Sequence, residues 1–244
     1  MGNFLEIGPK DFKRNDRAST WLQLADLVFV DNPVGTGFSY VDNHTLLTTD
    51  LQQVGKDLLT WLKAFLERHP EYRTRPFYIV GESYGGKWTV ELGKNLYEAI
   101  RAGTICMTQF KGIGLGDSAI SILDTENNDV VANKHVVDFM KPVHSTVATL
   151  LNYGLNVTVY NGNLDLLITT PGVKRWIDKL QWSGLRNFNN SKKKPFKTSR
   201  FNPAGFIQSH GNLQFIQVLN SGHMVPYDDP ESALFVLKLI LGRN

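Results

Sequence analysis

The chain has 244 residues, of which 42% are hydrophobic and 20% charged, and its formal net charge at pH 7 is +3. This size and apolar content suit a single globular domain over residues 1–244, and no apolar run is long enough to span a membrane. The basic run Lys192–Lys194, with Lys197 and Arg200, lies in a polar stretch without an aromatic platform. It is typical of a solvated surface loop, so we do not expect nucleic-acid binding.

The spacing of apolar residues predicts strands and helices that alternate along the chain. Strands are expected at 27–30, 77–80, 110–115, 157–160 and 213–219, and helices at 51–65, 88–100, 143–151 and 233–241. His69-Pro70 should end the first helix, and Gly103 is a suitable C′ residue for the second. The alternation implies a mainly parallel sheet with helices on both faces.

The pentapeptide Gly81-Glu82-Ser83-Tyr84-Gly85 follows the strand predicted at 77–80 and leads into the next helix. A G-x-S-x-G motif between a strand and a helix is typical of a nucleophile elbow, in which a strained turn exposes the serine hydroxyl. We expect Gly81 and Gly85 to relieve the crowding at this turn. An ordinary glycine-rich turn can have the same pattern, so the motif alone leaves both interpretations open.

Two later loops supply candidates for the partners of such a serine. Asp165 follows the strand predicted at 157–160, and His223 follows the strand predicted at 213–219. Each residue alone would more often be structural, but serine, acid and histidine occur in the chain order of an α/β-hydrolase triad. In that interpretation His223 takes the proton of Ser83, and Asp165 fixes the imidazole tautomer and stabilises the imidazolium.

Several longer motifs resemble those of the serine carboxypeptidases, a peptidase family of the α/β-hydrolase fold. They are Phe29–Tyr40 (FVDNPVGTGFSY), Gly81–Gly86 (GESYGG), Gly114–Ser118 (GLGDS) and Gly222–Pro226 (GHMVP). The resemblance implies hydrolysis of the C-terminal residue of peptides and proteins through an acyl-enzyme. It implies Ser83, Asp165 and His223 as the triad and the Tyr84 N–H as an oxyanion donor. No metal or organic cofactor is implied, and we find no His, Cys and carboxylate ligands at metal-binding spacing.

The resemblance also implies a pair of carboxyl groups, Glu6 and Glu82, that share a proton and bind the terminal carboxylate of the substrate. Physical chemistry supports such a pair, because two adjacent carboxyls cannot both ionise cheaply and one pKa rises. Loss of the shared proton would repel the substrate, so acidic working conditions are expected. The family further implies a loop that lines the pocket. Its residues here are Asp31, Asn32, Pro33 and Gly35, with Asp31 in a structural role.

The chain also departs from the family pattern. The family's opening strands and glycine loop would precede Met1, and a helical cap would follow Asp124. We therefore expect an α/β-hydrolase fold that is truncated at the N-terminus, lacks the helical cap and has lost one oxyanion donor. The expected consequences are slower catalysis, an open pocket and poor selectivity for side chains.

Cellular location is indicated by weaker signals. The lone Cys106 forms no internal disulfide, and its neighbours Ile105 and Met107 predict a buried or partly buried thiol. Sequons at Asn43, Asn156 and Asn189 suit a secreted or lysosomal glycoprotein, as the resemblance implies, although Asn156 opens a predicted buried strand. No signal peptide is recognised, so the chain would be cytosolic if translated as written.

Three other functions remain open from the sequence. A catalytically impaired carboxypeptidase-like protein, or a truncated isoform, would keep the fold without turnover. An esterase or acyltransferase would use the same triad, but the Glu6 and Glu82 pair argues against it because an ester has no free carboxylate to bind. A structural fragment would not fold alone. The preferred C-terminal residue and the oligomeric state are not predicted.

Overall fold

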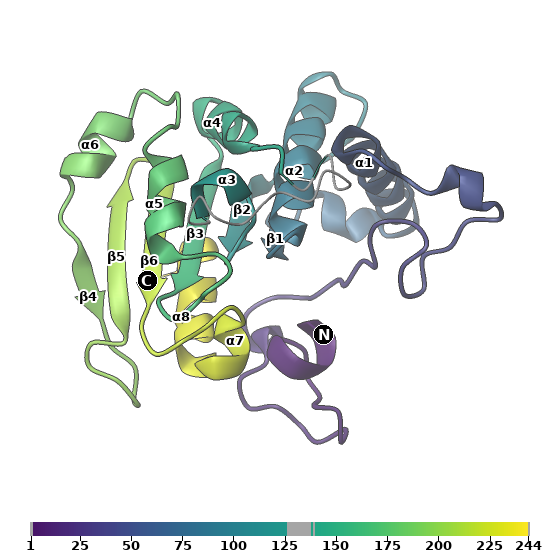
Figure 1. Cartoon of the computed structure of the whole chain (residues 1–244). Helices are drawn as coiled ribbons and strands as arrows, with labels where there is room; N and C mark the ends of the chain where they lie inside the picture. The colour runs from purple at the N-terminus through teal and green to yellow at the C-terminus, as the bar shows by residue number, and fades with distance from the viewer. Residues whose placement is uncertain (1, 126–137, 139, 244) are drawn as a thin grey trace.

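A six-stranded sheet forms the centre of the computed structural model, which describes residues 2–125, 138 and 140–243. The strand order is β1-β2-β3-β6-β5-β4 (Figure 1). Four parallel strands, β1 (Phe77–Glu82), β2 (Phe110–Gly116), β3 (Asn156–Gly162) and β6 (Leu213–Val218), are followed by antiparallel β5 (Gly205–His210) and β4 (Lys194–Phe196). The carboxyl ends of the four parallel strands therefore lie at one edge of the sheet.

Helices cover both faces of this sheet, as the alternating pattern predicts. The longer helices are α1 (Leu51–Arg68), α2 (Gly85–Arg101), α4 (His144–Asn152), α5 (Thr170–Ile177) and α8 (Pro230–Ile240). The shorter helices are α3 (Ile122–Thr125), α6 (Leu185–Asn190) and α7 (Val225–Asp228), with brief turns at Gly2–Glu6 (η1), Trp21–Gln23 (η2), His44–Leu46 (η3) and Pro70–Arg73 (η4). Val157 and Val159 of β3 pack in a core with α2, α4 and α5, whereas Tyr160 packs in a second core with α8. Alternate residues of a strand point to opposite faces, so the two cores lie on opposite sides of the sheet.

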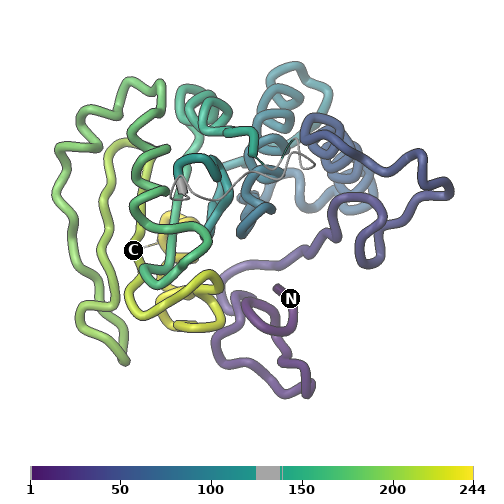
Figure 2. The backbone as a smooth tube through the Cα atoms, viewed as in Figure 1, coloured from purple at the N-terminus to yellow at the C-terminus, as the bar shows by residue number. Residues whose placement is uncertain are grey.

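The N-terminal segment packs against the C-terminal region, where the Arg243 guanidinium donates to the Leu24 carbonyl at 3.0 Å. Figure 2 shows the N-terminal segment, in purple, beside the yellow C-terminal region, and η1 contacts α7. No described helix combines the length and the apolar character needed to cross a membrane. The cap that the sequence is expected to lack would follow Asp124; residues 126–137 lie outside the described part of the chain.

The strand predicted at 27–30 is wrong. This segment is irregular, and Val28 and Phe29 are 50% and 44% exposed. A strand needs a hydrogen-bonded partner, and β1 pairs only with β2 among the described strands. The segment instead lines an apolar cavity of about 850 Å³ together with Ile79 and Trp88.

The polar loop predicted around the basic run is also partly wrong, because Lys194 begins β4 and pairs with Ile207 of β5. Phe196 supplies the apolar anchor, since it is buried and stacks on Phe235 of α8. A short edge strand that carries lysines is a common way to limit edge-to-edge aggregation. Helices α5 and α6 and strand β5 were not predicted.

Other expectations have mixed outcomes. The end of α1 at Arg68 and the C′ role of Gly103, which has φ +71°, are confirmed. Cys106, however, is exposed, because Ile105 and Met107 on either side take the buried positions. Asn156 is exposed at the start of β3, as are Asn43 and Asn189.

Replacing Ile113 with alanine should destabilise the fold by about 2–5 kcal/mol, because the side chain is 1% exposed in the core beneath α2 and α4. Circular dichroism during urea denaturation measures this loss. Lys111→Ala is the control, since Lys111 is exposed on the same strand and its loss should cost less than about 0.5 kcal/mol. A wild-type chain without a cooperative transition would favour the structural-fragment alternative instead.

Candidate active site

Ser83 lies in a strained turn between β1 and α2. Its φ is +56°, a left-handed conformation that residues with a side chain seldom adopt. The turn is fixed from both sides, since the Ser83 N–H donates to the Gly116 carbonyl at 3.0 Å and the Ser83 carbonyl accepts from the Ala119 N–H at 2.9 Å. The neighbouring strand β2 and the loop after it thus hold the serine in this conformation.

Glycines allow the Ser83 turn to pack closely against α2 and the loop after β2, but only one of the two predicted glycines is at a crowded position. A Cβ on Gly81 would lie 2.3 Å from Thr89 Oγ1, and a Cβ on Gly86 would lie 2.3 Å from Ser118 Oγ. A Cβ on Gly85 would meet nothing within 4 Å, so the expectation that Gly85 relieves crowding is wrong. The first turn of α2 turns Gly85 away from β2 and Gly86 towards it, which makes Gly86 the second crowded position.

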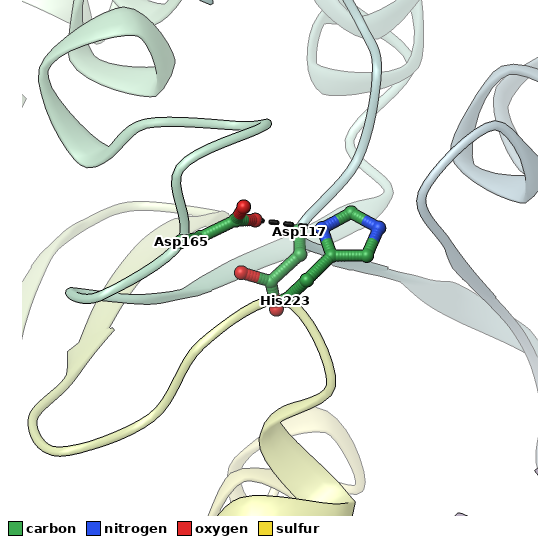
Figure 3. A group of neighbouring side chains, drawn as sticks. All are labelled: Asp117, Asp165 and His223. Carbon is green, nitrogen blue, oxygen red and sulfur yellow. Dashed lines mark hydrogen bonds and ion pairs between the residues drawn. The ribbon is translucent and has the colours of Figure 1, made fainter.

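Asp165 and His223 meet at the same edge of the sheet. Asp165 is in the loop after β3, His223 is in the loop after β6, and their Oδ2 and Nδ1 atoms are 2.7 Å apart (Figure 3). Asp165 Oδ1 accepts two further hydrogen bonds, from the N–H groups of Leu167 at 2.8 Å and Ile168 at 3.0 Å. Burial acts to raise the pKa of Asp165, but these hydrogen bonds and the one to His223 outweigh burial and lower it. The carboxylate is therefore ionised and fixed in orientation.

Ser83 is at this edge too, because it follows the parallel strand β1. Among the described residues, no hydrogen bond joins the Ser83 hydroxyl to the His223 ring. The structure therefore brings Asp165 and His223 into contact and leaves Ser83 at the same edge without a direct bond. Tyr84 follows Ser83 and begins the first turn of α2, so its N–H belongs to the positive end of the helix dipole.

Glu6 and Glu82 form the carboxyl pair that the sequence suggests. Each side chain acts on the pKa of the other, and Glu82 Oε2 is a buried atom without a hydrogen-bond partner among the described residues. Burial, followed by the charge and the hydrogen bond of Glu6, raises the pKa of Glu82 to about 9. The pKa of Glu6 is also raised, mainly by burial. The pair therefore retains a proton at neutral pH, and the charge of His223 also acts on Glu6.

Arg17 holds Glu6 at this position and was not identified from the sequence. Its guanidinium donates to the carbonyls of Leu5 and Glu6 and thereby caps the end of η1. The Trp21 N–H donates to the Ile7 carbonyl at 2.9 Å just beyond. No local motif marks an arginine that binds backbone carbonyls eleven or more residues away, so only the folded chain reveals it.

Asp117, at the carboxyl end of β2, is a further buried group beside the pair of Asp165 and His223. One possible ligand atom from each of these three residues lies within 4.8 Å of the others, and Figure 3 shows their side chains converging. The expectation that no metal-ligand cluster exists is therefore wrong in geometry, because the parallel strand ends bring distant residues together. The donors are already engaged, however. Asp165 binds His223, and Asp117 Oδ1 accepts from Asn161 at 2.7 Å and Gly162 at 2.8 Å.

Asp31 has the structural role expected for it in the loop predicted to line the pocket. Asp31 Oδ2 accepts from the Phe38 N–H at 2.8 Å, and the Ser39 hydroxyl donates to the Asp31 carbonyl at 2.6 Å, so Asp31 stabilises its own loop. Gly35 has φ +90° within this turn. Asn32 lines the apolar cavity beside β1, and the Asn32-Pro33 peptide is cis.

A mainly parallel sheet with a strained serine after one strand, an acid after a later strand and a histidine after the next parallel strand is the arrangement of an α/β-hydrolase. The family model described as serine carboxypeptidase matches residues 1–131 and 124–243. The chain belongs to the serine carboxypeptidase family.

Individual relatives agree with this assignment. Retinoid-inducible serine carboxypeptidase of Rattus norvegicus is 32% identical over 365 residues, which cover 98% of this chain and 80% of the relative. Serine carboxypeptidase-like 51 of Arabidopsis thaliana is 27% identical and covers 96% of this chain and 80% of its own length. The crystal structure of Kex1Δp, a prohormone-processing carboxypeptidase from Saccharomyces cerevisiae, has a TM-score of 0.80 at 17% identity and covers 99% of this chain and 80% of its own. That likeness shows the shared fold.

Replacing Gly81 with alanine should destabilise the chain by about 1–3 kcal/mol, because the new Cβ would overlap Thr89 and the Gly85 carbonyl. Gly85→Ala is the matched control, since its Cβ enters open space and its effect should be within about 0.5 kcal/mol. Thermal or urea unfolding compares the two variants. Equal stability of both would contradict the crowding described for this turn.

Proposed function

We propose that the chain is a serine-type carboxypeptidase that removes C-terminal residues from peptides or proteins through an acyl-enzyme. The observation that carries the proposal is the proton-sharing pair Glu6 and Glu82, next to the strained Ser83 and within the field of His223. A hydrolase of other acyl groups needs the serine and histidine but has no use for a neutral carboxylic acid at this position. The pair therefore favours a substrate with a free carboxylate.

In the proposed reaction the Ser83 hydroxyl attacks the carbonyl of the C-terminal peptide bond. Nδ1 of His223 is bonded to Asp165, which leaves Nε2 to take the serine proton. Asp165 stabilises the imidazolium, and the Tyr84 N–H donates to the oxyanion at the start of α2. The imidazolium then protonates the leaving amine, and His223 activates the water that hydrolyses the acyl-enzyme.

Binding of the substrate carboxylate is the proposed task of Glu82 and Glu6. A carboxyl whose pKa lies near 9 is neutral at the pH of acidic or neutral compartments and can donate a hydrogen bond to an anion. Above that pKa the pair would carry two negative charges and repel the substrate. The proposed enzyme therefore works best in mildly acidic to neutral solution.

The alternative is a carboxypeptidase-like protein without turnover. The absence of a hydrogen bond between Ser83 and His223 among the described residues favours it, although such bonds often form only when substrate is bound.

We propose further that residues 1–244 act as one domain. Exposed sequons at Asn43, Asn156 and Asn189 support a secreted or lysosomal location for it.

A fluorophosphonate probe should label the wild-type chain at Ser83, because the probe reacts with an activated serine whatever the natural substrate. Ser83→Ala should abolish labelling, and Ser209→Ala, an exposed position on β5, should leave it unchanged. Gel fluorescence in the presence of EDTA measures the reaction without any contribution from a metal ion. A folded wild-type chain that resists labelling would favour the alternative without turnover.

Affinity for a peptide with a free C-terminus should fall about tenfold as the pH rises from 6 towards 9.5, since the Glu82 pair loses its proton in that range. Calorimetry with the Ser83→Ala chain measures binding without hydrolysis. The additional change Glu82→Gln should remove this pH dependence, because an amide cannot ionise. The same peptide as its C-terminal amide is the control and should bind equally at both pH values; a flat profile for the free acid would contradict the proposed role.

A further inference from the structure

Asp117 has an unusual conformation at the carboxyl end of β2. It is fully buried, and its φ of +40° is outside the range that residues with a side chain normally adopt. Its N–H donates to the Tyr160 carbonyl at 2.9 Å, and its Oδ1 accepts from Asn161 Nδ2 and the Gly162 N–H. These bonds fix the side chain against the end of β3, the strand that leads into the Asp165 loop.

The second oxygen of Asp117 has no such partner. Oδ2 is buried and accepts no hydrogen bond from any donor of the described residues. The neighbouring group is another carboxyl, because an oxygen atom of Asp117 and an oxygen atom of Asp165 lie within 4.8 Å of each other and the two side chains act on each other. Two carboxylates cannot hydrogen-bond to each other unless one of them carries a proton. Asp165 already accepts from three donors, so it is the acceptor.

We propose that Asp117 is a positioning residue that stays protonated and donates a hydrogen bond from Oδ2 to the Asp165 carboxylate. Asp165 is then held by the backbone on one side and by a second carboxyl on the other, with its charge directed at His223. The inference rests on the proposed function, in which His223 is the base.

The surroundings of Asp117 support a neutral carboxyl. The titratable groups around it are Glu82 at the end of β1, Tyr160 on β3, Asp165 in the following loop and His223 after β6. Burial is the main reason that the pKa of Asp117 lies well above its usual range, and the negative charges of Asp165 and Glu82 raise it further. The hydrogen bond from Gly162 acts in the opposite direction and is outweighed. No described lysine or arginine pairs with this side chain.

The proposed bond has a consequence for the base. The hydrogen bond that Asp117 donates to Asp165 spreads the charge of the Asp165 carboxylate. Asp165 therefore stabilises the His223 imidazolium less strongly. Without the donor, Asp165 becomes more basic and the pKa of His223 rises. If Asp117 were ionised instead, replacing it with a neutral residue would remove a negative charge near His223, and the pKa of His223 would fall.

NMR titration of His223 tests the proposal without any need for turnover. The pKa of the ring and the low-field Nδ1–H resonance are measured in EDTA for the wild type, Asp117→Ala and Asp117→Asn, with the assignment made from His223→Gln. Gln208→Ala is the control for stability, since Gln208 is a buried polar residue on β5 that binds the Phe188 carbonyl far from this site. Asparagine keeps the acceptor for Asn161 and Gly162 and offers an N–H to Asp165.

In Asp117→Ala we expect the pKa of His223 to rise by about half a pH unit or more and the low-field resonance to broaden or disappear. Asp117→Asn should restore both to wild-type values, and Gln208→Ala should leave them unchanged. An unchanged or lower His223 pKa in Asp117→Ala would overturn the proposal. A fall of more than half a pH unit in the His223 pKa of Asp117→Asn would also overturn it. That result is informative even when the alanine variant does not fold. Absence of probe labelling in the wild type would count against the proposed function alone, because the NMR outcome does not depend on it.

Discussion

Buried carboxyl groups that lie against each other impose the main constraint on this site. Glu6 meets Glu82, and Asp117 meets Asp165, at the edge of the sheet where four parallel strands end. Two ionised carboxylates in such contact would repel each other in a medium that screens charge poorly, so the fold is compatible with these pairs only when protons are retained. Ser83 and His223 therefore lie beside carboxyl pairs that carry less negative charge than four ionised carboxylates would.

Much of the site follows from local sequence. Apolar periodicity locates the four parallel strands and the helices between them, and residues that follow such strands must meet at one edge. That rule alone brings Ser83, Asp165 and His223 together. It would also have identified Asp117, which directly follows β2 in the GLGDS segment. The chain order of a triad has no position for a second acid, so the triad pattern does not mark Asp117.

Other features depend on contacts that local sequence does not encode. Arg17 binds carbonyls of η1, and nothing near it in the sequence distinguishes it from a solvated arginine. The apolar run at 27–30 has the composition of a strand but pairs with none of the described strands. Pairing depends on segments that are distant in the sequence, so composition alone does not predict it. Gly85 and Gly86 are adjacent and identical in chemistry, and only the direction of the helix decides which of them faces Ser118.

The contact of η1 with α7 also bears on how the protein is made. Glu6 precedes His223 by more than two hundred residues in the chain, yet the charge of His223 acts on the Glu6 carboxyl in the folded site. A nascent chain that lacks the β6 loop has an incomplete site, so peptide hydrolysis cannot begin while the ribosome is still translating that region. Such a long loop closure is entropically costly and slow, which makes docking of the N-terminal segment a candidate for the final step of folding.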